Sequence, residues 1–275
     1  MSIQTAMKKF GSTTILALLK MRVWLLMKWQ HVQFPRRAIG GDWWIYSWRL
    51  NFLSYKNESE SLTWCKKLIK PGMVVLDIGA HLGYYTRLTS SLVKESGLVL
   101  AFEPCPENSP MLKYNVERLK FNNVRISNNA VSSKSGMAVL FISPGHSNHS
   151  LNNGYTEEQG RVEVETIAID SFLPTLGVKK VDFVKIDVEG AEPLVLEGMR
   201  QTVKNSPELV MLVEYNPIAL RAGGFTPSAL LDTLRTMDMS PMQILPNGDL
   251  GEVNLSSDET VNLLCIPLKK MDQFQ

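Results

Sequence analysis

The stretch VVLDIGAHLGYYT, residues 74–86, decides the fold. Its first three residues are apolar β-formers, a run typical of a buried central strand. Asp77 follows as the first polar residue. Gly79, Ala80 and Gly83 then predict a tight turn whose backbone can lie close to a ligand, because none of them has a bulky side chain. The stretch therefore predicts a strand, a ligand-binding turn and a helix.

A second acid follows the next expected strand. That strand, LVLAF over 98–102, ends at Glu103, 26 residues after Asp77. An acid in this place of a nucleoside-binding sheet accepts hydrogen bonds from ribose hydroxyls. A carboxylate that leads the turn repels a pyrophosphate, whereas it suits a ligand with amine or sulfonium groups. The two acids favour S-adenosylmethionine over NAD, and the alternative is a strand-to-helix turn that binds no ligand.

Composition places the chain among ordinary globular proteins. It has 275 residues, of which 44% are hydrophobic and 20% charged. Its cysteines, Cys65, Cys105 and Cys265, lie far apart, which argues against a disulfide framework or a thiolate zinc site and favours a reducing compartment. Lys20 and Arg22 interrupt the longest apolar stretch, so we expect no membrane span and a cytoplasmic location.

The N-terminal segment differs from the rest in charge. Residues 1–50 hold eight Lys and Arg against the single acid Asp42, a formal charge of +7, and five of the six tryptophans. We therefore divide the chain into an extension over 1–57 and a catalytic domain over 58–275. Two interpretations of the extension stay open. It packs as a helical cap on the domain, or residues 8–50 contact an anionic membrane surface, a lipid-linked substrate or a partner.

From residue 60 onward, apolar β-type runs alternate with helical patterns, which predicts a parallel sheet covered on both faces. We expect strands over 73–77, 98–102, 124–126, 137–142, 162–169, 181–186, 209–213, 242–245 and 261–266, and helices over 59–68, 83–94, 106–119, 191–203 and 230–237. The last two strands are joined by turn residues and should pair antiparallel. The polar loop over 143–160 is long enough to cover a site.

Six motifs resemble one known family in sequence and in order. They are DIGAHLGYYT (77–86), AFEPCPEN (101–108), NNAVSS (128–133), HSL (149–151), FVKIDVEGAEPLVLEGM (183–199) and LVEYNP (212–217). Together they make residues 58–217 similar to the FkbM family of S-adenosylmethionine-dependent methyltransferases. The resemblance implies an α/β class I methyltransferase (Rossmann-like) fold with a mostly parallel seven-stranded sheet and a C-terminal antiparallel hairpin. It also implies O-methylation of a sugar, glycolipid or secondary metabolite.

The resemblance assigns contacts to S-adenosylmethionine. It puts Asp77, Gly79 and Gly83 around the methionine half, Glu103 on the ribose, and Asn129 with Ala130 beside the adenine. An ordinary turn role for Asn129 stays open. The whole cofactor-binding set that we expect is Asp77, Gly79, Ala80, Gly83, Tyr85, Thr86, Glu103, Asn129, Ala130 and Asp187.

Transfer of a methyl group to a hydroxyl needs a base that accepts the hydroxyl proton. Asp187 and Glu189 follow the strand over 181–186, at the end where ligands bind in open sheets. We expect Asp187 to hold the cofactor or the acceptor and Glu189 to orient or deprotonate the acceptor, or the reverse. The alternative for both acids is to cap the following helix. Lys185 is expected to pair with Glu214.

Three further expectations complete the site. His149 is a candidate acceptor-binding residue or alternative base, and Glu192 is expected to brace the loop. His146 and His149 could hold a metal ion, but no acid adjoins them, so we expect none. We expect a small-molecule or glycan acceptor and no nucleic acid, because no Asn-Pro-Pro-Tyr type motif follows the strand over 181–186. A non-catalytic S-adenosylmethionine-binding protein and a nucleotide-dependent oxidoreductase remain alternatives.

Overall fold

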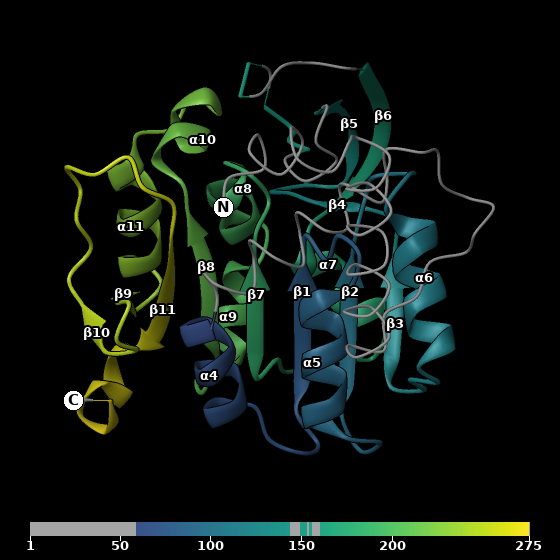
Figure 1. The fold of residues 1–275 in the computed structure, drawn as a ribbon, viewed down its shortest axis with the longest axis horizontal. Coiled ribbons are helices and arrows are strands. Elements are labelled where there is room, and N and C mark those ends of the chain that lie inside the picture. The colour runs from purple at the N-terminus through teal and green to yellow at the C-terminus, as the bar shows by residue number, and fades with distance from the viewer. Residues whose placement is uncertain (1–58, 144–148, 153, 156–159, 275) are drawn as a thin grey trace, which may run out of the picture. The chain divides into compact units, whose positions relative to one another are not determined.

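The computed structural model describes residues 59–274, apart from 144–148, 153 and 156–159. The expected N-terminal extension over 1–57, with its proposed contact segment 8–50, lies outside the described residues, and so does His146. The described chain forms two sheets with helices packed around them (Figure 1). No helix in this described part has both the length and the hydropathy that crossing a bilayer requires.

The main sheet has eight strands in the order β10-β9-β11-β8-β7-β1-β2-β3. These strands are β1 (Val74–Ile78), β2 (Leu98–Phe102), β3 (Val124–Ser127), β7 (Phe183–Ile186), β8 (Val210–Tyr215), β9 (Met239–Ile244), β10 (Leu250–Gly251) and β11 (Val261–Pro267). The five strands from β8 to β3 are parallel, and β11 pairs antiparallel with both β8 and β9. This arrangement confirms the expected class I methyltransferase fold. The sheet has eight strands instead of the expected seven, because the two-residue strand β10 also pairs with β9.

Helices cover both faces of the main sheet, which explains the unbroken apolar runs of its strands. They are α4 (Ser59–Leu68), α5 (Tyr84–Val93), α6 (Ser109–Arg118), α7 (Ile169–Thr175), α8 (Glu192–Glu197), α9 (Arg200–Asn205), α10 (Pro217–Ala222), α11 (Pro227–Arg235) and the 3-10 helix η1 (Leu268–Gln273). Successive residues of β1 point to opposite faces. Val75 packs in the core under α4 and α5, whereas Leu76 packs in the core under α7, α8 and α11.

The expected helix over 191–203 is wrong as a single element, since the structure divides it into α8 and α9. The break lies at Gly198, where an added Cβ atom would come within 2.1 Å of the Ser132 carbonyl oxygen. Asp170 then binds the start of α9, because its carboxylate accepts hydrogen bonds from the backbone N–H groups of Gln201 and Thr202. Close packing against Ser132 and this cap together end one helix and begin the next.

A second, three-stranded sheet has the order β4-β6-β5. It contains β4 (Ala130–Val131), β5 (Gly136–Ile142) and β6 (Gly160–Ile167), and β5 pairs antiparallel with β6. This confirms the expected strand over 137–142 and its returning partner. Beyond β5, an isolated bridge between Phe141 and Ser150 holds the chain around His149 beside the strand.

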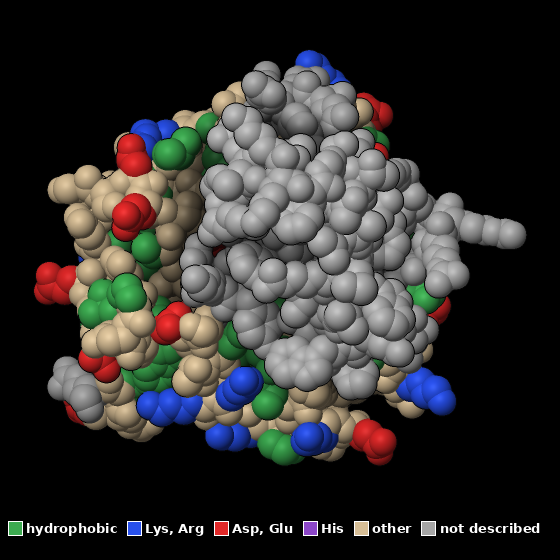
Figure 2. Space-filling model, in the orientation of Figure 1, with side chains coloured by type: hydrophobic (Ala, Val, Ile, Leu, Met, Phe, Trp, Pro, Cys, Tyr) green, Lys and Arg blue, Asp and Glu red, His purple; other side chains and the backbone are tan. Residues whose placement is uncertain are grey.

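The described surface mixes charges of both signs. Figure 2 shows acidic and basic side chains interspersed over the described part of the visible face. Exposed ion pairs such as Arg221 with Asp258 and Arg235 with Asp232 are of this kind. Exposed ion pairs contribute little to stability, so the stability of the fold depends mainly on the apolar cores on the two faces of the main sheet.

Candidate active site

The carboxyl ends of β1, β2, β7 and β8 meet at one edge of the main sheet, because these strands are parallel neighbours. Asp77 lies within β1, and Glu103 follows the last residue of β2 directly. Asp187 follows β7 in the same way, and Glu214 is the penultimate residue of β8. The structure therefore gathers acids from four strands at the edge where ligands bind in open α/β sheets.

The turn after β1 is tied to both neighbouring strands. The backbone N–H groups of Gly79 and Ala80 both donate to the carbonyl oxygen of Phe102, at 3.0 and 2.9 Å. Gly79 has a φ of 83°, and an added Cβ atom would lie 1.8 Å from the carbonyl oxygen of Asp187. Gly79 thus has a further role that the sequence did not show. It lets the chain after β7 approach the turn, which brings Asp187 to the site.

Asp77 and Glu103 are both buried and are held by donors of their own chain. Asp77, 2% exposed, accepts a 2.5 Å hydrogen bond from the Thr86 hydroxyl. Glu103 accepts hydrogen bonds from the backbone N–H groups of His81 and Cys105, at 2.7 and 3.0 Å. Burial raises the pKa of Asp77 to about 6 and the pKa of Glu103 to about 7. A cationic ligand or hydroxyl donors at these acids would favour their ionised forms.

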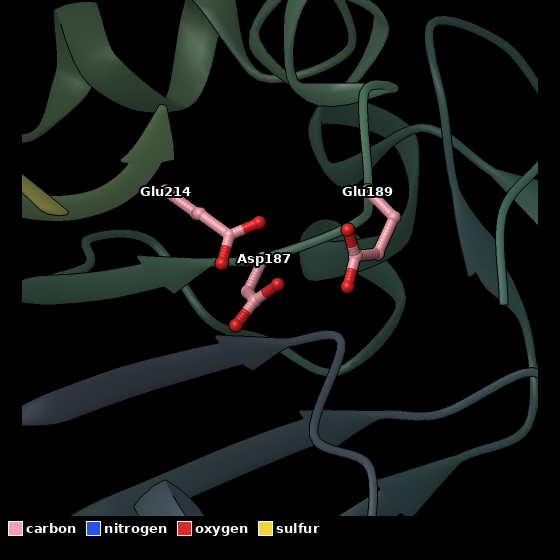
Figure 3. A group of neighbouring side chains, drawn as sticks. All are labelled: Asp187, Glu189 and Glu214. Atoms are coloured by element: carbon pink, nitrogen blue, oxygen red, sulfur yellow. The ribbon is translucent and has the colours of Figure 1, made fainter. Parts of the chain in front are cut away.

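A second group of acids lies beyond β7 and β8. Asp187, Glu189 and Glu214 each place one carboxylate oxygen within 4.8 Å of the others (Figure 3). The ammonium of Lys185, which is 2% exposed, lies 3.2 Å from the Asp187 carboxylate. The expected pair of Lys185 with Glu214 is therefore wrong. In the register of β7 and β8, Lys185 lies opposite Leu212, and Glu214 lies two residues beyond that position.

Burial and neighbouring charge raise the pKa of Glu189 and of Glu214. Burial and then the charge of Asp187 raise the pKa of Glu189 to about 8 and the pKa of Glu214 well above its usual value. Each of these two glutamates also has a buried carboxylate oxygen, Oε2, without a hydrogen-bond partner among the described residues. The hydroxyl of Tyr155 bonds to the Glu189 carboxyl and lowers its pKa by a smaller amount.

The loop after β7 has a strained backbone that several hydrogen bonds hold. Glu189 has a φ of 54°, which is uncommon for a residue with a side chain. Its carbonyl oxygen accepts hydrogen bonds from the Ser150 hydroxyl at 2.6 Å and the Asn152 amide at 3.3 Å. Glu192 accepts hydrogen bonds from the N–H groups of Val188 and Gly190, which confirms that it braces the loop. The helix-cap alternative for Asp187 and Glu189 is not supported, because no side chain caps α8.

The model of the methyltransferase FkbM domain matches residues 77–239 of this chain. The chain belongs to the FkbM family. Enzymes of this family are S-adenosylmethionine-dependent methyltransferases, so the chain is an FkbM methyltransferase.

Three curated relatives of this FkbM methyltransferase have informative names. The 2-O-methyltransferase NoeI of Sinorhizobium fredii is 27% identical over 68% of this chain and 81% of its own length. The 31-O-demethyl-FK506 methyltransferase FkbM of Streptomyces tacrolimicus is 27% identical over 60% of this chain and 77% of its own length. The hexuronic acid methyltransferase AglP of Haloferax volcanii is 29% identical over 48% of this chain and 52% of its own length.

The residues at the edge fit the chemistry of S-adenosylmethionine. The cofactor contains a sulfonium, an ammonium and two ribose hydroxyls, which are cationic groups or hydrogen-bond donors. Glu103 uses acceptor positions for two backbone N–H groups and retains others, because a carboxylate has about four. Burial raises the pKa values of Asp77 and Glu103 although both acids accept hydrogen bonds from the chain, so a cation or further hydroxyl donors beside them would favour their ionised forms. We therefore keep both as predicted cofactor contacts.

Other expected site residues have different surroundings. Tyr85 and Thr86 are buried in the first turns of α5, beside Asp77. The side chain of Asn129 is held by Ser127 and Glu165, at 2.8 and 3.0 Å, which leaves its predicted adenine contact untested. His149 accepts a hydrogen bond at Nδ1 from the Ser143 N–H at 3.1 Å.

Sequence reasoning missed two participants. Glu214 is expected from the sequence only as an ion-pair partner of Lys185. It follows a buried apolar strand, and the same pattern predicts a site role for Asp187. Tyr155 had no signal, because it lies in a polar loop without a pattern. Its contacts with Glu189 and with Asn216, whose amide donates to the Tyr155 hydroxyl at 2.7 Å, emerge only from the fold.

Proposed function

We propose that this FkbM methyltransferase transfers the methyl group of S-adenosylmethionine to a hydroxyl of a sugar, a glycolipid or a secondary metabolite. One observation supports this most. The carboxyls of Asp187, Glu189 and Glu214 lie together at the same sheet edge as the predicted cofactor acids. The names of the relatives agree with such an acceptor, since they specify 2-O and 31-O positions and a hexuronic acid.

The reaction requires alignment and removal of one proton. S-adenosylmethionine supplies the methyl group when bound, so that a C–O bond forms as the C–S bond breaks and a neutral thioether leaves. The acceptor oxygen must be held at about 3–3.5 Å from the methyl carbon and in line with the sulfur. A protein carboxylate must accept the hydroxyl proton as the C–O bond forms.

We assign proton removal to Glu189 and orientation to Asp187. Glu189 has a buried oxygen without a hydrogen-bond partner, which can accept a hydroxyl proton. Its position is maintained by Tyr155 at the carboxyl and by Ser150 and Asn152 at the backbone. The Asp187 carboxylate is held by its ion pair with the Lys185 ammonium, which suits it to orient the substrate through a hydrogen bond. His149 remains a proposed acceptor contact.

The segment over 8–50 remains a proposed contact with an anionic membrane surface or a lipid-linked acceptor of a cytoplasmic enzyme. Its excess of basic residues and tryptophans supports this proposal. Sedimentation with vesicles that contain phosphatidylserine should retain the protein, and equal retention by neutral vesicles would contradict the electrostatic part.

An acceptor screen tests the proposed function. The full chain is incubated with S-adenosylmethionine labelled in its methyl group and with panels of glycans, glycolipids and polyketide alcohols. We expect label on an oxygen of one acceptor class, and its position can be read by mass spectrometry. Label on nitrogen or carbon would contradict O-methylation. Binding of NADH without binding of S-adenosylmethionine, measured by calorimetry, would contradict the methyltransferase assignment itself.

A further inference from the structure

The acids beyond β7 and β8 have the spacing of a cation site. Asp187, Glu189 and Glu214 offer three carboxylate oxygens within 4.8 Å of one another. In an octahedral Mg²⁺ shell with metal–oxygen distances of about 2.1 Å, adjacent oxygens lie about 3.0 Å apart and opposite oxygens about 4.2 Å apart, both inside that 4.8 Å limit. Figure 3 shows the three carboxyl groups converging from β8, from the end of β7 and from the loop that follows it.

Two of these acids have a buried oxygen atom that accepts no hydrogen bond within the described part of the chain, which independently indicates that they bind a ligand. The Oε2 atoms of Glu189 and Glu214 are buried and have no partner among the described residues. A buried carboxylate oxygen without a partner is costly, and such groups in proteins are usually paired or bind metals. The nearby ammonium, on Lys185, bonds to Asp187 instead.

Charge balance points to a dication. Asp187, Glu189, Glu192 and Glu214 bring four carboxyls that affect one another electrostatically. Among the described residues, Lys185 supplies the ammonium that lowers the pKa of Glu189 and Glu214. A cation bound among them would favour the ionised form of all four, and their charge would then exceed that of Lys185 by three negative charges. S-adenosylmethionine has a net charge of +1, because its sulfonium and ammonium outweigh its carboxylate. An excess of two negative charges remains, which one divalent cation would neutralise.

We propose that Asp187, Glu189 and Glu214 bind one divalent cation, Mg²⁺ or Mn²⁺. Carboxylate oxygens are the ligands that such hard cations prefer. This site replaces the expectation, from the sequence, that the chain holds no metal ion. It also differs from the pair His146 and His149, the candidate ligands that the sequence offered.

The cation's role rests on the proposed function. Three protein oxygens leave about half of an octahedral shell open. Two neighbouring oxygens of an acceptor, such as a vicinal diol of a sugar or a hydroxy acid, can fill part of that shell. A hydroxyl bound to a divalent cation has a lower pKa, so it loses its proton more readily to Glu189, which offers one carboxylate oxygen to the cation and keeps the other for the proton. The site therefore selects acceptors with adjacent oxygen atoms over isolated alcohols.

Direct binding of Mn²⁺ tests the site without any acceptor. The full chain is titrated with MnCl₂ at neutral pH, and free Mn²⁺ is measured by electron paramagnetic resonance. We expect one Mn²⁺ per chain, displaced by excess Mg²⁺. Glu214→Gln should weaken binding at least about tenfold, because it removes a charged ligand. Glu163→Gln, which changes an exposed acid on β6, is the matched control and should bind as the natural chain does.

The outcomes separate this proposal from the proposed function. Circular dichroism checks that Glu214→Gln is folded, and Glu189→Gln serves as a second ligand variant. No Mn²⁺ binding by the natural chain up to about 1 mM, a range that includes weak protein sites for hard cations, would overturn the site. Mn²⁺ binding by Glu214→Gln and by Glu189→Gln that is as tight as that of the natural chain would also overturn the site. O-methylation that persists unchanged in EDTA would overturn the cation's role and leave the proposed function intact. Binding that the ligand variants weaken supports the site even if no hydroxyl is methylated.

Discussion

The acids at the β1 and β2 half of the sheet edge differ in their hydrogen bonding from those at the β7 and β8 half. At β1 and β2, Asp77 and Glu103 accept hydrogen bonds from Thr86 and from backbone N–H groups of the adjoining turns. At β7 and β8, Glu189 and Glu214 each have a buried oxygen without a partner among the described residues. The acids at β1 and β2 are therefore held by hydrogen bonds from the chain, whereas two acids at β7 and β8 have a buried oxygen that still needs a proton, a donor or a cation.

The difference suggests that the acids at β1 and β2 bind the cofactor and that the acids beyond β7 and β8 take part in the reaction. Acids that the protein already holds can position a cofactor with little rearrangement, since their geometry exists before the ligand arrives. Acids that crowd one another are poised to accept a proton or a cation.

The largest expected effect comes from Glu189→Gln. It keeps the shape of the side chain but removes the proton acceptor, so kcat should fall about 10²- to 10⁴-fold. The affinity for S-adenosylmethionine, measured by calorimetry, should stay within about twofold, because the cofactor acids lie at the other half of the edge. Glu163→Gln controls for the loss of a charge. An unchanged kcat in Glu189→Gln would remove it as the base.

Glu103→Gln should produce the opposite pattern. A hydrogen bond to a charged group contributes about 1.5–3 kcal/mol, so the affinity for S-adenosylmethionine should fall about 10- to 100-fold. At saturating cofactor, kcat should change far less than in Glu189→Gln. Calorimetry and steady-state kinetics measure the two quantities. Natural cofactor affinity in a folded Glu103→Gln would refute the assignment of the ribose to this acid.

Cofactor affinity should depend on pH through Glu103. Burial raises its pKa to about 7, and the nearby charge of Asp77, whose own pKa is about 6, adds to that rise. The ionised acid is the binding form, so affinity should increase as pH rises and be lost as pH falls through 7. Between pH 6 and pH 8 the expected gain is about tenfold. In Glu103→Gln this step should vanish, and a step that survives would belong to another group.

The smallest effect is expected from Asn129→Ala. Ser127 and Glu165 already hold this side chain, so its contribution to adenine binding should be below about 1 kcal/mol, or about fivefold in affinity. Calorimetric titration measures it against the natural chain. A loss as large as that of Glu103→Gln would show that Asn129 binds the adenine directly.

Much of this edge was predictable because it follows from strand patterns. The apolar runs before Asp77, Glu103 and Asp187 placed those acids at strand ends, and parallel pairing brings such ends together. The helix over 59–68 and the strand over 98–102 were predicted with the bounds that the structure has.

The remainder depended on contacts between distant segments. The break at Gly198 arises from its approach to Ser132, and the ion pair of Lys185 with Asp187 depends on how the chain turns after β7. Tyr155 meets Glu189 only because a loop from the second sheet returns to the edge of the first. None of these contacts leaves a local pattern of residue types, so they could not be deduced before the fold was known.

A crystal structure of the full chain with S-adenosylhomocysteine would show where the cofactor binds and which way its sulfur points. We predict that the ligand lies at the carboxyl ends of β1 and β2, with its ribose hydroxyls bonded to Glu103 and its sulfur facing Asp187 and Glu189. A ligand bound away from these strand ends, or one whose sulfur is turned from the acids beyond β7, would contradict the account.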